Sequence, residues 1–183
     1  MTDWNGIKFE KFVGLGNYIS MFKSNDYIYS FVVTFIFTVI NMLAVNLVAF
    51  GLALLCTSKV KGRNFYRAAY FIPNLIGGIV LGYVWQFIFN KVMTTVIEGS
   101  TSMLTDPNLA IAAILIVSTW QYAGYIMMIY VTGLQSVPKD ILEASNVDGA
   151  NQITTLLKIK VPMIANTFTV CIFLTLVNSF KQF

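Results

Sequence analysis

Four long runs of this sequence contain no Asp, Glu, Lys or Arg, and they restrict the possible folds more than any other feature. The runs are Ser30–Cys56, Ala68–Asn90, Leu109–Gly133 and Pro162–Phe180. A helix rises about 1.5 Å per residue, so about 20 apolar residues cross the hydrocarbon core of a bilayer. A charge at the centre of such a helix costs about 2.5–3.5 kcal/mol. The sequence therefore predicts four transmembrane helices, at about 30–56, 68–90, 109–133 and 162–180.

The composition points to the same environment. Hydrophobic residues make up 57% of the 183 residues and charged residues 11%, whereas soluble domains carry roughly 25% charged residues. A soluble fold of this size has too much surface to hide so much apolar area. Barrel strands are short and alternate in polarity, unlike these runs. The predicted fold class is an all-α, polytopic transmembrane helix bundle, formed as a single domain over residues 1–183.

Several kinds of chemistry lack the residues that they need. The chain has no His, and it has no G-x-x-x-x-G-K-[ST] loop that would hold ATP. The runs contain no cluster of titratable residues, which argues against a membrane-embedded enzyme. Cys56 and Cys171 lie in apolar runs and are interpreted as small buried hydrophobic side chains. We expect no cofactor, no metal and no nucleic-acid partner, and we interpret the clustering of the net charge of +4 as membrane topology.

The distribution of basic residues predicts the orientation of the helices. The connection 57–67 carries Lys59, Lys61, Arg63 and Arg67 and no acidic residue. The positive-inside rule places such a connection in the cytoplasm. By alternation, residues 1–29 and 91–108 are expected outside and residues 134–161 inside.

The predicted cytoplasmic segment 134–161 is longer than a plain connection requires. Gly133 is expected to end the preceding helix, and Ser136 to cap a new one with Pro138 in its first turn. Asp148-Gly149 predicts a turn, residues 150–159 a second helix, and Pro162 the start of the last span. This helix–turn–helix fits either a docking site for a partner protein or an amphipathic element resting on lipid.

The spacing of residues within this segment matches a known pattern. Glu143-Ala144-Ser145 is followed after three residues by Gly149, after nine more by Ile159, and then by Pro162. This arrangement closely resembles the EAA loop, which marks the membrane subunits of ABC importers. Ser145 replaces the second Ala of that pattern, and Val161 its usual Leu. The resemblance implies that the loop contacts the ATPase through Glu143, Ala144, Ser145, Asp148, Gly149, Ile159 and Pro162.

The flanking segments are similar to those of carbohydrate permeases of the maltose and glycerol-phosphate type. The similar segments are Phe12–Tyr18, Lys61–Arg63, Phe71–Pro73, Trp85 and Gly133–Pro138. Such permeases usually have six spans or more, and four are predicted here. The chain is therefore expected to start after the first span of the family and to stop before the last one.

The resemblance implies a function in transport, without enzymatic activity of this chain. It implies a permease of an ATP-driven sugar importer in a bacterial or archaeal cytoplasmic membrane. The implied partners are ABC ATPase subunits, which hydrolyse ATP, a second permease subunit, identical or homologous, and an extracytoplasmic sugar-binding protein. Two alternatives stay open: a permease for another solute, and a truncated membrane remnant that transports nothing.

Polar and aromatic residues inside the spans are candidates for the substrate path. Asn41, Trp120 and Gln121 lie near the middle of their runs. Amides can bind sugar hydroxyls and aromatic faces can stack on sugar rings, but hydrogen bonding between helices explains the amides equally well, and core packing explains the tryptophan. Gly77-Gly78 and Gly82 are interpreted as sites of close helix packing.

Overall fold

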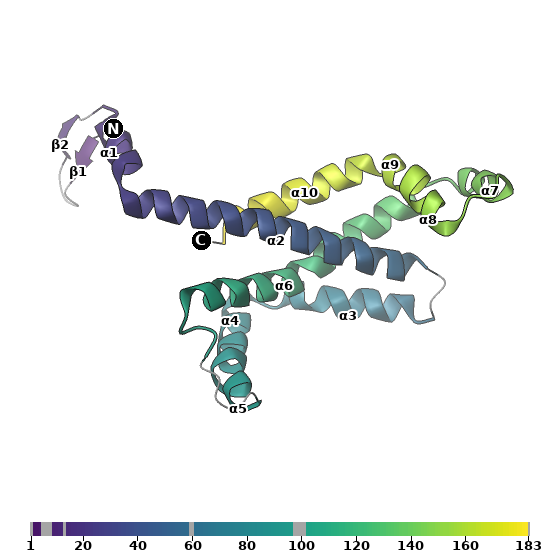
Figure 1. Ribbon diagram of the computed structural model, residues 1–183, viewed down its shortest axis with the longest axis horizontal. Coiled ribbons are helices and arrows are strands. Elements are labelled where there is room, and N and C mark those ends of the chain that lie inside the picture. The colour runs from purple at the N-terminus through teal and green to yellow at the C-terminus, as the bar shows by residue number, and fades with distance from the viewer. Residues whose placement is uncertain (1, 5–8, 13, 59–60, 97–101, 183) are drawn as a thin grey trace.

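The computed structural model describes residues 2–4, 9–12, 14–58, 61–96 and 102–182. Val13 and Lys59, which belong to predicted motifs, lie outside these residues. The regular elements of the described chain are helices, except for a short antiparallel pair of strands in which β1 (Thr2–Trp4) pairs with β2 (Phe9–Phe12). The sequence did not predict this pair of strands. It is followed by α1 (Gly16–Lys23), and the rest of the chain forms the expected all-helical membrane bundle (Figure 1).

Two long helices form the frame of the bundle. α2 (Asn25–Thr57) has 33 residues and α6 (Pro107–Gln135) has 29, and both are long and apolar enough to cross a membrane. The predicted spans 30–56 and 109–133 lie within them. Asp106 caps α6, because its carboxylate accepts hydrogen bonds from the N–H groups of Asn108 and Leu109.

The second predicted span is a sharply bent pair of helices and not one straight helix. α3 (Arg63–Leu75) is followed by α4 (Gly78–Phe87) and the π-helical turn η1 (Ile88–Val92), at an angle of 96°. Pro73 contributes no N–H group to α3, and Ile76 has an extended backbone (φ −77°, ψ 129°). These residues end α3, so α4 leaves the bundle axis (Figure 1). The short α5 (Met93–Val96) follows η1.

The last predicted span is also bent, close to its start. α7 (Lys139–Val147), α8 (Gln152–Thr155), the π-helical turn η2 (Leu156–Lys160) and α9 (Val161–Met163) precede α10 (Ala165–Phe180). The segment 152–163 meets α10 at 71°, and Ile164 stands at the corner with φ −103° and ψ 22°. Pro162 therefore lies before the bend, and the straight part of this helix begins at Ala165.

The core lies where α2, α6 and α10 meet. Val45, Ala49 and Ala53 recur every four residues on α2 and are fully buried, and their small side chains allow α6 to approach closely. Phe50, Tyr130 and Phe168 pack together, with ring centroids 4.9–5.3 Å apart. Cys56 and Cys171 are free and buried, as expected.

Candidate functional site

The structure contains three groups of residues that could carry function: the projecting segment α7–α9, a hydrogen-bonded cluster inside the bundle, and a cleft between α4 and α6. Figure 1 shows α7 and α8 at the end of the molecule that also carries the α2–α3 connection. α1 lies at the opposite end of α2. This arrangement agrees with the predicted placement of 57–67 and 134–161 on one side of the membrane.

The turn after α7 is closed by a Schellman motif. The N–H of Ala150 donates to the carbonyl of Ser145 at 3.0 Å, and the N–H of Gly149 donates to the carbonyl of Asn146 at 3.1 Å. Gly149 has φ +78°, a conformation that residues with a Cβ rarely adopt. The predicted turn at Asp148-Gly149 is present, and its backbone geometry alone accounts for the glycine.

The side chains of α7 divide between the interior of the segment and its surface. Ser145 is 5% exposed, and its Oγ donates to the carbonyl of Leu142 at 2.9 Å and lies 3.4 Å from Oγ1 of Thr155 on α8. Glu143 and Ala144 are exposed. Ser145 thus packs α7 against α8, whereas its two predecessors in the sequence are free to meet another surface. Thr155 was not predicted, because its role depends on the geometry of the intervening turn.

The other predicted residues of this segment lie along its length. Asp148 and Pro162 are exposed, and Ile159 is half-buried. Asn151 was missed: its Oδ1 accepts from the N–H of Thr154 at 2.7 Å, so it caps α8. An Asn before a helical run is a recognised cap signal.

Two details of the predicted helix ends are wrong. Ser136 does not cap α7; its Oγ donates back to the carbonyl of Gly133 at 2.8 Å, and α7 begins after Pro138. Gly133 does not end α6, which continues to Gln135. A Cβ at Gly133 would meet Oγ1 of Thr167 at 2.5 Å, so this glycine permits contact with α10.

A cleft of about 690 Å³ separates the projecting segment from the end of α2. Leu54 of α2 and Ser58 just after it line one side, and Leu142, Asn146 and Lys160 line it from the segment. The segment therefore stands off the bundle and is connected to it mainly through α6 and α10.

Asn41 occupies a buried cluster between three helices. It is 2% exposed; its Nδ2 donates to Oγ of Ser179 on α10 at 2.8 Å, and its Oδ1 accepts from Oγ of Ser118 on α6 at 2.6 Å. Both ends of the amide are used in helix–helix contacts. Of the two explanations left open for Asn41, its contacts match hydrogen bonding between helices.

A second asparagine on α2 makes the same kind of connection. Asn46 Nδ2 donates to Oγ1 of Thr175 on α10 at 2.8 Å, and Asn46 Oδ1 accepts from the hydroxyl of Tyr130 on α6 at 2.8 Å. The two asparagines join α2, α6 and α10 at two levels. The sequence did not reveal Asn46, because its partners lie 84 and 129 residues away.

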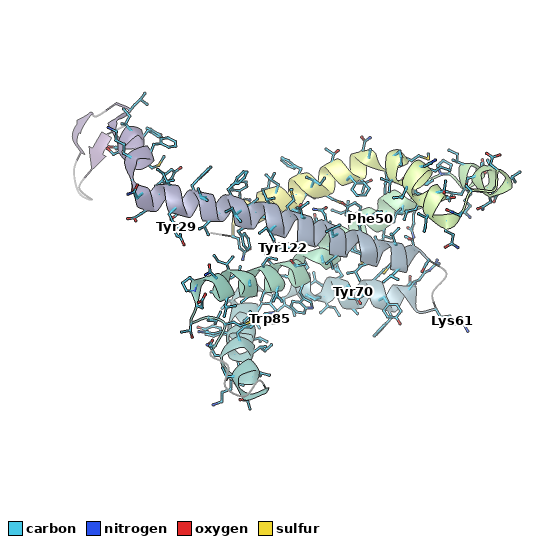
Figure 2. All side chains as sticks on the ribbon, in the orientation of Figure 1. Tyr29, Phe50, Lys61, Tyr70, Trp85 and Tyr122 are labelled. Carbon is cyan, nitrogen blue, oxygen red and sulfur yellow. The ribbon has the colours of Figure 1, made fainter. Side chains whose placement is uncertain are left out.

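The other two predicted path residues are found at the cleft between α4 and α6. Gln121 lines this cleft, and Trp120 lies beside it. The cleft has a volume of about 620 Å³, and its largely apolar lining includes the aromatic side chains of Tyr83 and Trp85 and the amides of Gln86 and Gln121. Trp120 is 43% exposed and meets Trp85 edge to face, with ring centroids 5.5 Å apart. Figure 2 places Trp85 at the junction of α4 with α6.

The glycines predicted to allow close packing do not do so. A Cβ added at Gly77, Gly78 or Gly82 would meet nothing within 4 Å. A close helix contact is found instead at Gly124 on α6, where a Cβ would lie 1.8 Å from the carbonyl oxygen of Tyr70 on α3. Ala123 and Gly124 form a pair of small residues in an apolar helix, which is a pattern typical of close helix packing. The prediction placed this role at other glycines.

Comparison with known proteins gives consistent matches along the chain. Residues 49–183 match the family described as binding-protein-dependent transport system inner membrane component. The probable starch degradation products transport system permease protein AmyD of Thermoanaerobacterium thermosulfurigenes is 40% identical, and the match covers 100% of this chain and 64% of that protein. The sn-glycerol-3-phosphate transport system permease protein UgpA of Agrobacterium fabrum is 34% identical over 94% of this chain and 60% of its own length.

Solved structures share the fold. A chain of a bacterial ABC transporter involved in the import of the acidic polysaccharide alginate superposes with a TM-score of 0.82 at 19% identity, covering 93% of this chain and 63% of that chain. The alginate transporter in complex with its pentasaccharide-bound periplasmic protein gives a TM-score of 0.76 at 19% identity, covering 89% and 60%. The chain thus spans about three fifths of the length of these relatives.

Proposed function

This chain belongs to the family of binding-protein-dependent transport system inner membrane components, and we propose that it is a translocation subunit of an ATP-driven sugar importer. Its proposed location is the cytoplasmic membrane of a bacterium or an archaeon. The observation that carries the proposal is the projecting segment α7–α9, which presents Glu143 and Ala144 at the end of the molecule that carries the basic α2–α3 connection.

In this proposal α7 is the helix that contacts an ATPase subunit. Glu143 is exposed, so its carboxylate can accept charge-assisted hydrogen bonds from a basic residue of the partner. Ala144 beside it is small enough to let the partner's surface come close. Ser145 and Thr155 keep α7 and α8 packed together, so that a displacement of α7 moves α8 with it. ATP hydrolysis belongs to the partner, and this chain transmits its effect.

The cleft between α4 and α6 is proposed as part of the substrate path. Trp85 and Trp120 provide aromatic faces, and Gln86 and Gln121 provide amides that can bind sugar hydroxyls. A second permease subunit would close the open side of this path. An external binding protein would deliver the sugar, and the alginate transporter in complex with its pentasaccharide-bound periplasmic protein supports such a partner.

Deletion of the gene in its host tests the proposed substrate class. Uptake of radiolabelled malto-oligosaccharides should fall at least about tenfold and return on complementation, because the turnover rate of the transporter depends on the presence of this subunit. The relatives named UgpA support a second candidate, a permease for sn-glycerol 3-phosphate. Loss of glycerol-phosphate uptake with sugar uptake intact would assign that function, and no loss of either would refute both.

A charge-neutralising pair of variants tests the contact with the ATPase. Glu143→Gln should weaken co-purification of the ATPase and lower uptake, while the variant subunit stays in the membrane. Asp26→Asn is the matched control, since Asp26 is also exposed but lies at the other end of α2. Equal co-purification of the ATPase with both variants would exclude a role of Glu143 in coupling.

A further inference from the structure

α1 carries an apolar stripe that the described part of the chain leaves uncovered. Leu15, at the cap of α1, and Ile19 and Phe22 within it are spaced four and three residues apart, so they fall on one side of the helix, with Tyr18 beside them. Their exposed fractions are 60%, 55%, 63% and 50% respectively. Ser20 lies on the opposite side. Four large apolar side chains in that state need an apolar environment beyond the described residues.

This stripe is continuous with the apolar surface of α2. Only Ser24 separates α1 from α2, and Phe22 contacts Tyr27 edge to face, with ring centroids 5.7 Å apart. The first turns of α2 then expose Ile28 and Tyr29. Because α2 is a membrane-spanning helix, the environment that covers its exposed apolar side chains is lipid, and the same environment extends to α1.

The length of α2 sets the depth of α1. The 33 residues of α2 extend about 50 Å, whereas a bilayer is about 30 Å thick in its hydrocarbon core and about 40–45 Å with its headgroups. α2 therefore reaches from one headgroup layer to the other, and α1 is attached at one of these layers. Figure 1 shows α1 turned away from the axis of α2, as a helix lying along a membrane surface must be.

The charge of α1 fits a headgroup layer as well. The helix has no acidic residue in its first turn, and Lys23 lies in its last turn, where it can meet lipid phosphates. Tyr18 is of the residue type that concentrates at the headgroup level. Interfacial helices combine these features: an apolar face in the acyl boundary and a polar face in water.

We propose that α1 is a membrane-surface anchor. It lies in the headgroup layer on the side of the membrane opposite the α2–α3 connection, with Leu15, Ile19 and Phe22 inserted toward the acyl chains. It thereby fixes the height of α2 in the bilayer. This proposal depends on the membrane embedding of the chain and not on the transported substrate.

Site-directed spin labelling of neighbouring residues provides the test. The whole chain, with Cys56→Ala and Cys171→Ala, is reconstituted into vesicles of phosphatidylcholine and phosphatidylglycerol, and Ile19→Cys and Ser20→Cys are labelled separately. Collisions with oxygen, which partitions into lipid, are compared with collisions with a water-soluble nickel chelate. The oxygen-to-nickel ratio at position 19 should exceed that at position 20 at least about threefold, because an interfacial helix buries one face about 5–10 Å.

Two results would overturn the anchor. Similar ratios at positions 19 and 20 would mean that water surrounds α1. Shielding of position 19 from both reagents would mean that protein, such as a second permease subunit, covers the stripe. Phe22→Cys, on the same face, repeats the measurement at a second position and must follow position 19 if the proposal holds.

Discussion

The three-helix core of α2, α6 and α10 and the part of the molecule formed by α4, called the limb below, are built from similar residues but are held in different ways. In the core, Asn41 and Asn46 join α2 to α6 and α10 through buried hydrogen bonds. In the limb, α4 leaves the bundle at 96°, a Cβ added at its glycines would meet nothing within 4 Å, and aromatic and amide side chains of α4 line a cleft. Polar side chains in a membrane helix thus serve packing where they are paired across helices, and remain available to a solute where they are not.

The largest expected effect concerns the glycines of the two regions. Gly124→Ala should destabilise the protein by at least about 2 kcal/mol, because the added Cβ would lie 1.8 Å from the carbonyl oxygen of Tyr70 and α3 would have to move. Gly82→Ala should cause no loss of stability, because nothing lies within 4 Å of its Cβ and alanine is the better helix former. Thermal unfolding in detergent measures both. Equal losses in the two variants would contradict the distinction between core and limb.

A smaller effect is expected from removing an amide in each region. Asn41→Leu should cost about 1–2 kcal/mol, because it removes two interhelical hydrogen bonds in an apolar environment. Gln86→Leu, in the cleft, should leave stability nearly unchanged. The midpoint of unfolding in a denaturing detergent titration measures both. A loss for Gln86→Leu as great as for Asn41→Leu would show that the cleft residues also hold the fold.

The smallest effect is expected in the projecting segment, which is held by backbone geometry. Gly149→Ala should cost about 1 kcal/mol, because alanine is strained at φ +78°. The loss should be local, so hydrogen exchange should accelerate in α7 and α8 and stay unchanged in α2. Asn146→Ala, one turn earlier on the exposed side of α7, is the control. Faster exchange throughout α2 would show that the segment and the core unfold together.

The sequence predicted the frame of the fold better than its bends. α2 and α6 follow from long charge-free runs, because a bilayer leaves few other structures open to such runs. The break between α3 and α4 was missed, although Pro73 and Gly77-Gly78 mark it, because hydropathy measures apolarity and not direction. The pairing of β1 with β2 was also missed.

The turn geometry in the candidate segment was predictable from local sequence, whereas the functional roles of its residues stay predictions. Glu143 and Gly149 were identified from spacing, and the turn at Gly149 is where the pattern placed it. The inward position of Ser145 was not predictable, because it depends on Thr155 across the turn. Asn41 could not be separated from Gln121 in the sequence, because its partners Ser118 and Ser179 lie 77 and 138 residues away.

The corner at Ile164 gives the C-terminal part of the chain the shape of a crank. Two helical arms, 152–163 and α10, meet there at 71°. A push along the first arm acts off the axis of the second and so exerts a torque on it. Because α10 is hydrogen-bonded to α2 through Ser179 and Thr175, the proposed coupling would pass that torque to α2 as well as to α10.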